Sequence, residues 1–169
     1  MSTVTPEPGG SGELLVAIHD HLRHELVELR SAAAALAQGR LPLGEVREQV
    51  RDSQLRRTFA QLGAFCQMYC RFVHGHHGIE DARMYPDLLA ADPSLQPVVD
   101  ELTADHVRIG GLLRTLDDEL ARTHGADDTV AAAQRVAVAL EALAEALVEH
   151  LRVEEEALVP ALDRLRLLI

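Results

Sequence analysis

The sequence predicts an all-α protein, an up-down-up-down antiparallel four-helix bundle with a short extra helix between helices 1 and 2. Alanine, leucine, arginine and glutamate dominate the chain, and these residues favour helices. No run alternates apolar and polar residues as a half-buried strand would. Apolar residues instead recur at helical spacing in four long runs joined by mostly short links, which is the pattern of an antiparallel bundle.

Helix breakers bound the first two runs. The first helix is expected over about residues 13–38, because Gly39 follows it as a stop. The second is expected over about 54–89, ahead of Ala-Asp-Pro at 91–93. Between them, residues 41–53 begin with Pro42 and Gly44 and then show one or two amphipathic turns, which predicts the short extra helix.

Similar signals bound the other two runs. The third helix is expected to begin near Ser94 and to end before Gly125. Asp127 or Asp128 can cap the fourth, which is expected to end at about residue 159, next to Pro160.

Length and composition indicate one domain. A chain of 169 residues with 47% hydrophobic residues can build a core and is far too apolar for a disordered chain. We expect a flexible N-terminal lead-in at 1–12 and a single bundle domain at 13–169. The lead-in lacks the basic start and apolar run of a secretion signal, and no stretch approaches the roughly 20 apolar residues of a membrane span. We therefore expect a cytoplasmic protein that does not associate with membranes.

Charge and cysteine content narrow the partners. Sixteen arginines, with no lysine, against 27 acidic residues give a net charge of −11, which repels nucleic acid. Cys66 and Cys70 lie one turn apart, and buried, unreactive thiols are favoured over a second soft-metal site or a redox pair. The closing Leu-Arg-Leu-Leu-Ile is compatible with a homodimer contact.

Two helices carry ligand-type residues inside their apolar stripes. His150 and Glu154 interrupt the stripe of the fourth helix, and His76 and Glu80 continue the stripe of the second. The two His-x-x-x-Glu segments form an internal repeat in register, since Met84-Tyr85-Pro86 follows one and Leu158-Val159-Pro160 follows the other at the same offset. A buried carboxylate without a partner is costly, so a matched pair indicates a shared metal site.

The first and third helices each add one histidine. His106 and His19 are both flanked by apolar residues at the same helical offsets, so both are predicted to face the core. His19 is favoured over His21, although His21-x-x-x-Glu25 imitates the spacing on the other helices. His77 and Asp81 point about 100° away from the stripe and are assigned to the rim or to solvent.

Nitrogen and carboxylate donors together define the chemistry. This set suits iron, manganese or zinc, and the lack of a core-facing thiolate argues against a structural zinc cage. Two glutamates can each bridge two ions while two histidines cap each ion. Coordination positions then remain for water, an oxo or hydroxo bridge, dioxygen, peroxide or nitric oxide.

Three other classes of protein fit poorly. A ferritin-like site needs Glu-x-x-His on two helices, and a zinc-protease helix needs His-Glu-x-x-His; neither pattern occurs. A metal-free bundle would require six buried polar residues to satisfy one another.

The order His, His-x-x-x-Glu, His, His-x-x-x-Glu across four helices resembles the hemerythrin-like, HHE cation-binding family over about residues 13–162. The segments HDHLRHEL and YCRFVHGHHGIEDARMYPDL look most like bacterial members. The resemblance implies a carboxylate-bridged centre of two non-haem iron ions, with iron favoured over manganese and zinc, that binds O2 or reacts with peroxide or nitric oxide. The ligands that it implies are His19, His76, Glu80, His106, His150 and Glu154.

One position departs from the oxygen-carrying hemerythrins. They have a further histidine one turn after the helix-3 ligand, where this chain has Gly110. The loss opens a coordination position and favours catalase-like peroxide chemistry, nitric oxide chemistry or redox turnover, with an electron donor still to be identified, over simple O2 carriage. His77 or Glu25 could replace the missing donor, and Tyr69 could wall the pocket. Non-catalytic O2 or nitric oxide sensing, O2 carriage and iron holding remain the alternative.

Overall fold

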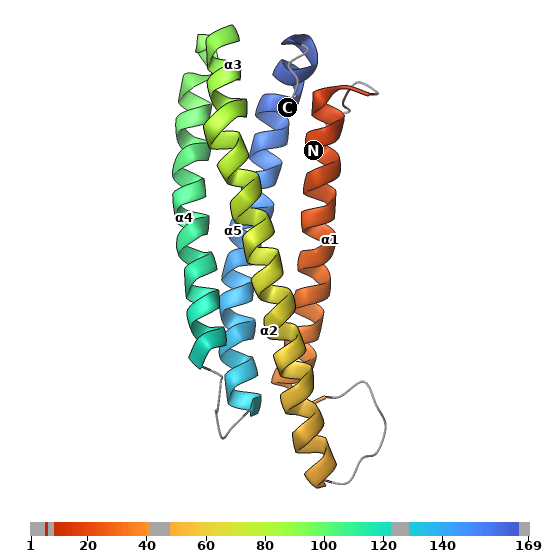
Figure 1. Cartoon of the computed structure of the whole chain (residues 1–169). Helices are drawn as coiled ribbons and strands as arrows, with labels where there is room; N and C mark the ends of the chain where they lie inside the picture. Colours follow the sequence, from red (N-terminus) through yellow and green to blue (C-terminus); the bar gives the residue numbers. More distant parts are fainter. Residues whose placement is uncertain (1–5, 7–8, 41–47, 123–128, 166–169) are drawn as a thin grey trace. The chain divides into compact units, whose positions relative to one another are not determined.

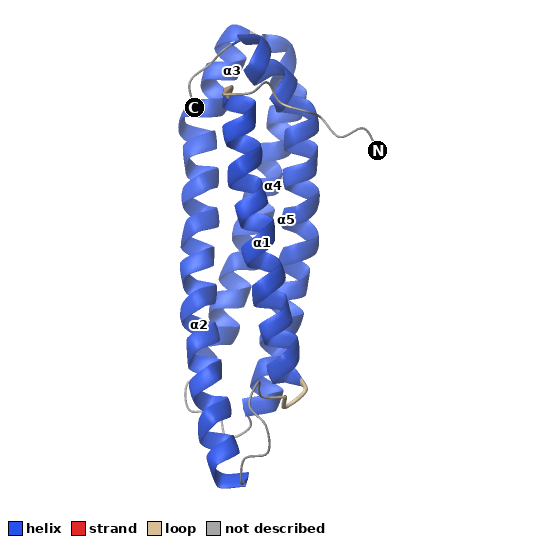
Figure 2. Cartoon of the chain, turned by 90° about the vertical axis from the view of Figure 1, so that its right-hand side faces the viewer, coloured by secondary structure: helices blue, strands red, loops and turns tan. Residues whose placement is uncertain are grey.

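The computed structural model describes residues 6, 9–40, 48–122 and 129–165, and within this part of the chain every regular element is a helix (Figure 2). The prediction of an all-α protein with four long helices is confirmed. The elements are α1 (Ser11–Ala37), α2 (Glu48–Ile79), the π-helix η1 (Glu80–Met84), α3 (Tyr85–Ala91), the 3₁₀-helix η2 (Pro93–Leu95), α4 (Gln96–Arg122) and α5 (Thr129–Leu165).

The chain forms two compact units, and each unit contains a segment of all four long helices. Residues 1–24, 72–110 and 145–169 form the first unit, and residues 25–71 and 111–144 form the second. No described helix is long and apolar enough to cross a membrane.

The first unit has an apolar layer next to its polar site. In Figure 1 the beginning of α1, the short helix α3 and the end of α5 gather at one end of this unit. Their buried side chains form one cluster with the beginning of α4, and it contains Leu15, Met84, Tyr85, Leu88, Val99, Leu102, Leu158, Val159, Ala161 and Leu162. Burial of these side chains fixes how the four segments are positioned along one another in this unit.

Gly12 lets α1 approach α5 closely in the same unit. Its backbone N–H donates a hydrogen bond to Asp163 Oδ1 at 3.2 Å. A Cβ atom at Gly12 would lie only 2.6 Å from that oxygen and 2.9 Å from Val159 Cγ1. The helix α1 begins at Ser11, two residues before the start expected at about residue 13, and residues 1–5 and 7–8 of the expected lead-in lie outside the described residues.

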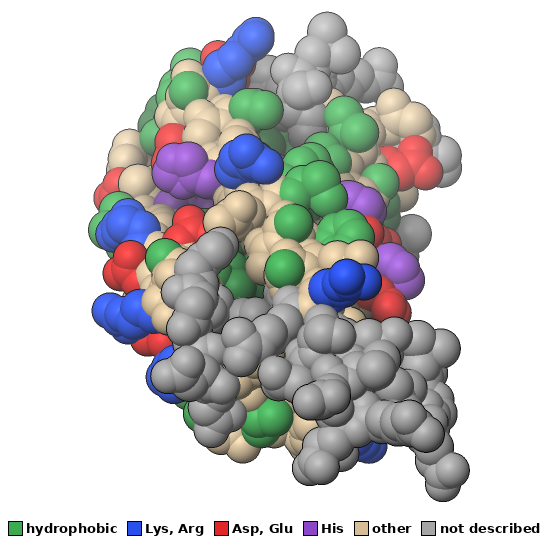
Figure 3. Space-filling view, turned by 60° about the horizontal axis from the view of Figure 1, so that its bottom comes forward, with side chains coloured by type: hydrophobic (Ala, Val, Ile, Leu, Met, Phe, Trp, Pro, Cys, Tyr) green, Lys and Arg blue, Asp and Glu red, His purple; other side chains and the backbone are tan. Residues whose placement is uncertain are grey.

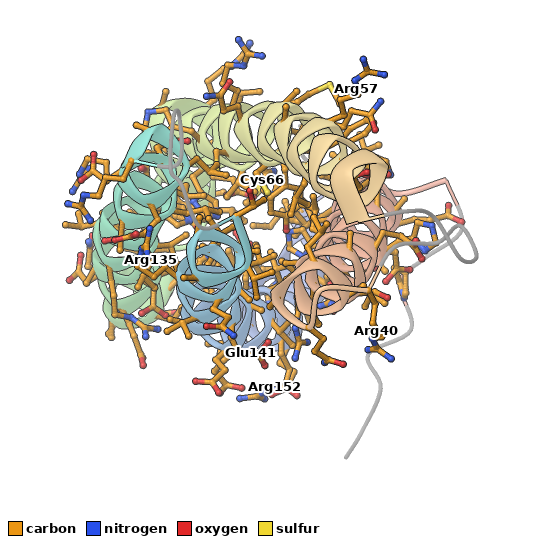
Figure 4. All side chains as sticks on the ribbon, turned by 90° about the horizontal axis from the view of Figure 1, so that it is seen from below. Arg40, Arg57, Cys66, Arg135, Glu141 and Arg152 are labelled. Atoms are coloured by element: carbon orange, nitrogen blue, oxygen red, sulfur yellow. The ribbon has the colours of Figure 1, made fainter. Side chains whose placement is uncertain are left out.

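The second unit is held by aliphatic side chains and two thiols. Cys66 and Cys70 are buried, as expected, and burial raises the pKa of each thiol to about 12, with a smaller contribution from Asp117. Figure 4 shows Cys66 pointing into the interior while Arg57 and Arg135 point outward. Such thiols are poor nucleophiles because almost none of the thiolate form is present at neutral pH.

Arginine and acidic side chains are interspersed on the surface, as they are on the face shown in Figure 3. In the second unit, the guanidinium of Arg30 on α1 binds both carboxylate oxygens of Glu141 on α5, with Nε 2.8 Å from Oε2. Arg135 pairs with Glu119 at 3.3 Å. Exposed pairs of this kind each stabilise a fold by about 1 kcal/mol or less.

Two expected helix boundaries are wrong. Residues 48–53 belong to α2 and do not form a separate helix, because no glycine or proline lies between residues 48 and 62 to stop helix propagation. The first part of the expected extra helix, 41–47, lies outside the described residues, as do Asp127 and Asp128. The fourth helix continues through Pro160 to Leu165, because buried residues on both sides of the proline hold the last turns in place.

The helical periodicity of α2 predicts an apolar stripe through Leu62, Phe65, Tyr69 and Phe72, and this prediction is wrong in part. Phe65 is 58% exposed and Phe72 is 45% exposed, whereas the neighbouring Cys66 and Val73 are fully buried. The buried face of α2 thus keeps Leu62 and Tyr69 but takes Cys66, Cys70 and Val73 in place of the two phenylalanines.

Candidate metal centre

Seven ligand-type side chains are buried in the first unit. They come from α1, α2, η1, α4 and α5, and none is more than 9% exposed: His19, His76, His77, Glu80, His106, His150 and Glu154. The four residues of the repeat and the two histidines predicted on the first and third helices are all among them. The seventh, His77, was expected at the rim or in solvent.

The side chains form two groups with metal-ligand geometry. His19, His76, Glu80 and Glu154 form the first group, and His77, Glu80, His106 and His150 form the second. Within each group the potential ligand atoms all lie within 4.8 Å of one another. Because Glu80 belongs to both, two ions bound here would share this carboxylate.

Each group contains a pair of converging imidazoles. The Nε2 atoms of His19 and His76 are 3.1 Å apart, and so are those of His106 and His150. Two nitrogens that each lie about 2.1 Å from one ion, at right angles, are about 3 Å apart. Each pair therefore fits a single ion.

The two oxygens of Glu80 face different groups. Oε1 is 3.0 Å from His76 Nε2, and Oε2 is 3.5 Å from His106 Nε2. Neither oxygen has a hydrogen-bond partner with acceptable geometry, although both are buried. Three further buried atoms also lack a hydrogen-bond partner: Glu154 Oε2, His77 Nε2 and His150 Nδ1. Buried polar atoms without partners are costly, and cations at the two groups would satisfy the carboxylate oxygens and the free imidazole lone pair of His77.

Two carboxylates orient the histidines from outside. Glu155 Oε1 lies 2.9 Å from His19 Nδ1, and Asp81 Oδ1 lies 2.8 Å from His106 Nδ1. When the Nδ1–H donates to a carboxylate, Nε2 keeps its lone pair for a metal. From the sequence, Asp81 was expected at the rim or in solvent, and the acidic run Glu154-Glu155-Glu156 predicted a solvated edge for Glu155, so neither role was expected. A signal was present, since each follows a glutamate of the repeat.

Burial and charge set the protonation states of the metal-free site. Burial lowers the pKa of His77 to about 2 and that of His150 to about 4, and His106 adds to both effects. Burial alone would also lower the pKa of His19, but the nearby carboxylates of Glu154, Glu155 and Glu80 raise it to about 10. Burial raises the pKa of Glu80, but the nearby imidazoles of His19 and His76 outweigh this effect and bring the pKa to about 2. A charged Glu80 and neutral His77 and His150 present electron pairs suited to a cation.

His77 lies in the core and not at the rim. It is 5% exposed, and its ring centroid is 4.0 Å from that of His106 and 5.1 Å from that of His150. The expectation of an outward side chain assumed a narrow buried stripe and a regular helix. The buried face here is wide enough for two consecutive residues, and the π-helix that begins at Glu80 widens the next turn so that Met84 and Tyr85 are both buried.

The choice between two histidines on α1 is clear in the structure. His19 is fully buried, whereas His21 is exposed and rests edge-on against Phe72, with ring centroids 5.6 Å apart. Glu25 and Tyr69, two other candidates from the sequence, belong to the second unit and to neither ligand group.

Tyr85 is a site residue that the sequence analysis did not identify. It is 2% exposed, and its hydroxyl donates a hydrogen bond of 2.8 Å to Glu154 Oε1. The hydroxyl oxygen also lies 3.3 Å from His106 Nε2, and the two rings are stacked with centroids 5.5 Å apart. Burial and the charge of Glu154 raise the pKa of Tyr85 well above its usual value, so the phenol stays protonated. One signal for this role is present in the sequence: the repeat has tyrosine at position 85 where its other half has Val159.

Fold and site together define an all-α cation-binding domain whose His and Glu ligands converge from several helices. The model of the hemerythrin HHE cation-binding domain matches residues 12–162. The chain belongs to this family, as the resemblance of its motifs indicated. No curated protein and no solved structure matches it.

Proposed function

We propose that this protein holds two non-haem iron ions at the two ligand groups and binds, and reacts with, dioxygen or related small oxidants such as peroxide and nitric oxide. The observation that carries the proposal is the shared carboxylate. Glu80 directs one buried oxygen toward each group, and neither oxygen has a hydrogen-bond partner.

Each of the two ligand groups would hold one ion with its own histidines. His19, His76 and Glu154 would hold one ion, and His77, His106 and His150 would hold the other, with Glu80 common to both. Iron bound there would supply a reversible change of oxidation state and coordination positions for a small oxidant. Asp81 and Glu155 fix the rings of His106 and His19, and the apolar layer at one end of the unit limits access of water.

A second candidate function, reversible binding of dioxygen or nitric oxide without turnover, gains support from His77. Gly110, which stands where oxygen-carrying hemerythrins have a helix-3 histidine, was expected to disfavour simple O2 carriage. His77 gives the second group a third imidazole. The lack of a histidine at position 110 therefore no longer favours one function over the other. Turnover would in addition require an electron donor or a second molecule of oxidant.

Metal analysis with spectroscopy tests the proposal. Protein purified from iron-supplied cells should contain close to two irons per chain, and its absorption spectrum should change on exposure to air or peroxide. Steady consumption of peroxide would support turnover, and a spectrum restored by removing the gas would support reversible binding.

A matched pair of variants on α1 gives the control. His19→Ala should lose iron, whereas His21→Ala should keep it, because only His19 is buried among the ligand atoms. Absence of iron from the wild-type protein, or equal iron in both variants, would contradict the proposal.

A further inference from the structure

The two glutamates of the repeat are equivalent in sequence but not in structure. Both oxygens of Glu80 lack a hydrogen bond and face different ligand groups. Glu154 has only one such oxygen, Oε2, which lies closer to the first group, 3.3 Å from His19 Nε2, than to the second, 3.8 Å from His150 Nε2. Its other oxygen accepts the hydrogen bond from Tyr85. The equivalent of Tyr85 in the other half of the repeat is Val159, which has no hydroxyl to offer Glu80.

The hydroxyl of Tyr85 stands between Glu154 and the second ligand group. It is 2.8 Å from Glu154 Oε1 and 3.3 Å from His106 Nε2. A phenol has a single proton to donate, and a carboxylate at the shorter distance is the stronger acceptor. His106 uses its Nδ1–H toward Asp81, so its Nε2 carries a lone pair that can face an ion.

We propose that Tyr85 is a positioning residue that makes Glu154 a one-oxygen ligand of the first ion and leaves Glu80 as the only carboxylate bridge. This inference rests on the proposed function in one respect, since it requires two bound ions. Its consequence is an asymmetric centre. The ion held by His77, His106 and His150 receives one glutamate oxygen, and the position that a second bridge would fill stays open beside the Tyr85 hydroxyl.

A purely structural role for Tyr85 predicts something different. In that case the buried hydroxyl only needs a hydrogen-bond acceptor. Its removal then lowers the free energy of unfolding without altering how Glu154 binds metal. The binding mode of a carboxylate can be read from infrared spectra, because the separation between its antisymmetric and symmetric stretches is wide for one-oxygen binding and narrower for a bridge.

The experiment compares infrared difference spectra, Co²⁺-loaded minus metal-free, for the full chain and three variants. The wild-type protein should show one wide and one narrow carboxylate pair. In Glu154→Gln the wide pair should disappear, which assigns it. In Tyr85→Phe the wide pair should be replaced by a second narrow pair. Met84→Leu, an adjacent buried substitution of similar volume without a ligand contact, should match the wild type.

The possible failures are distinguishable. If Co²⁺ titration shows no two-ion binding to the wild-type chain, the proposed di-metal function fails. If two ions bind but the wild type has two narrow pairs, or if Tyr85→Phe keeps its wide pair, the inference about Tyr85 is overturned while the di-metal function stands. The wild-type spectrum alone tests the asymmetry should Tyr85→Phe not fold.

Discussion

His77 and His106 stack face to face, with ring centroids 4.0 Å apart and ring planes inclined by 9°. The two rings come from different helices, and both belong to the ligand group that also contains His150 and Glu80. Two protonated imidazoles at this separation would repel each other strongly, whereas two neutral rings can stack and direct lone pairs toward one cation. The stacked pair is therefore an arrangement of two imidazoles that could bind one cation.

We predict that His77→Ala weakens binding of one of the two ions and leaves the other in place. The second group would keep only two imidazoles and Glu80, so its affinity for Co²⁺ should fall by at least about tenfold. Isothermal titration would measure both binding steps. His74→Ala, an exposed histidine on the same helix, is the control. Unchanged binding of two ions by His77→Ala would show that His77 is not a ligand.

Loss of the carboxylate behind His106 should act through that ring. Asp81→Ala removes the acceptor 2.8 Å from His106 Nδ1, so the ring is free to turn or to carry its proton on the wrong nitrogen. Substitutions of such outer partners typically reduce metal affinity by about 10–100-fold. Asp87→Ala, which removes an exposed acid from α3, should have no effect on the same titration. Equal affinities in the two variants would exclude an orienting role for Asp81.

Acid should destabilise the metal-free protein below pH 6.5. The folded-state pKa values of His77 and His150 are lowered to about 2 and about 4, so the unfolded chain takes up protons below pH 6.5 while the folded chain does not. Each histidine then removes up to about 1.4 kcal/mol of stability per pH unit until its folded-state pKa is reached. Urea unfolding between pH 7 and pH 5 would measure the slope, and His77→Ala should make it shallower. If His77→Ala leaves the slope unchanged, the lowered folded-state pKa of His77 would be contradicted.

Alkali should destabilise the metal-free protein through His19. Its folded-state pKa is raised to about 10, so the stability that it contributes is complete below pH 6.5 and is lost as the pH rises toward 10. Since a metal must displace this proton, metal binding near pH 7 should release protons into a weakly buffered solution. Potentiometric titration would detect the release. His19→Ala should abolish the share of the proton release that comes from His19, and His21→Ala should leave it unchanged.

Gly12 and Gly75 should respond to alanine in opposite ways. Gly12→Ala places a Cβ atom 2.6 Å from Asp163 Oδ1 and should cost about 1–3 kcal/mol of unfolding free energy. Gly75 lies inside α2, and a Cβ atom there meets nothing within 4 Å, so Gly75→Ala should stabilise the fold by about 0.5–1 kcal/mol. Thermal unfolding of the two variants checks the sign. A neutral Gly12→Ala would mean that α1 and α5 can separate there at little cost.

The amino-acid sequence by itself determined the helical class and the four long helices, and it predicted six core-facing residues of ligand type. It could do so because helical periodicity fixes which residues share a face of one helix, and a carboxylate on an apolar face needs a partner wherever the helix packs. The tertiary structure decided the width of each buried face and the rotation of each helix. These placed His77 in the core, moved Phe65 out of it and brought Tyr85 to Glu154. Such contacts join residues of different helices and depend on the π-turn at Glu80, which shifts the register of α3, so no pattern along a single helix contains them.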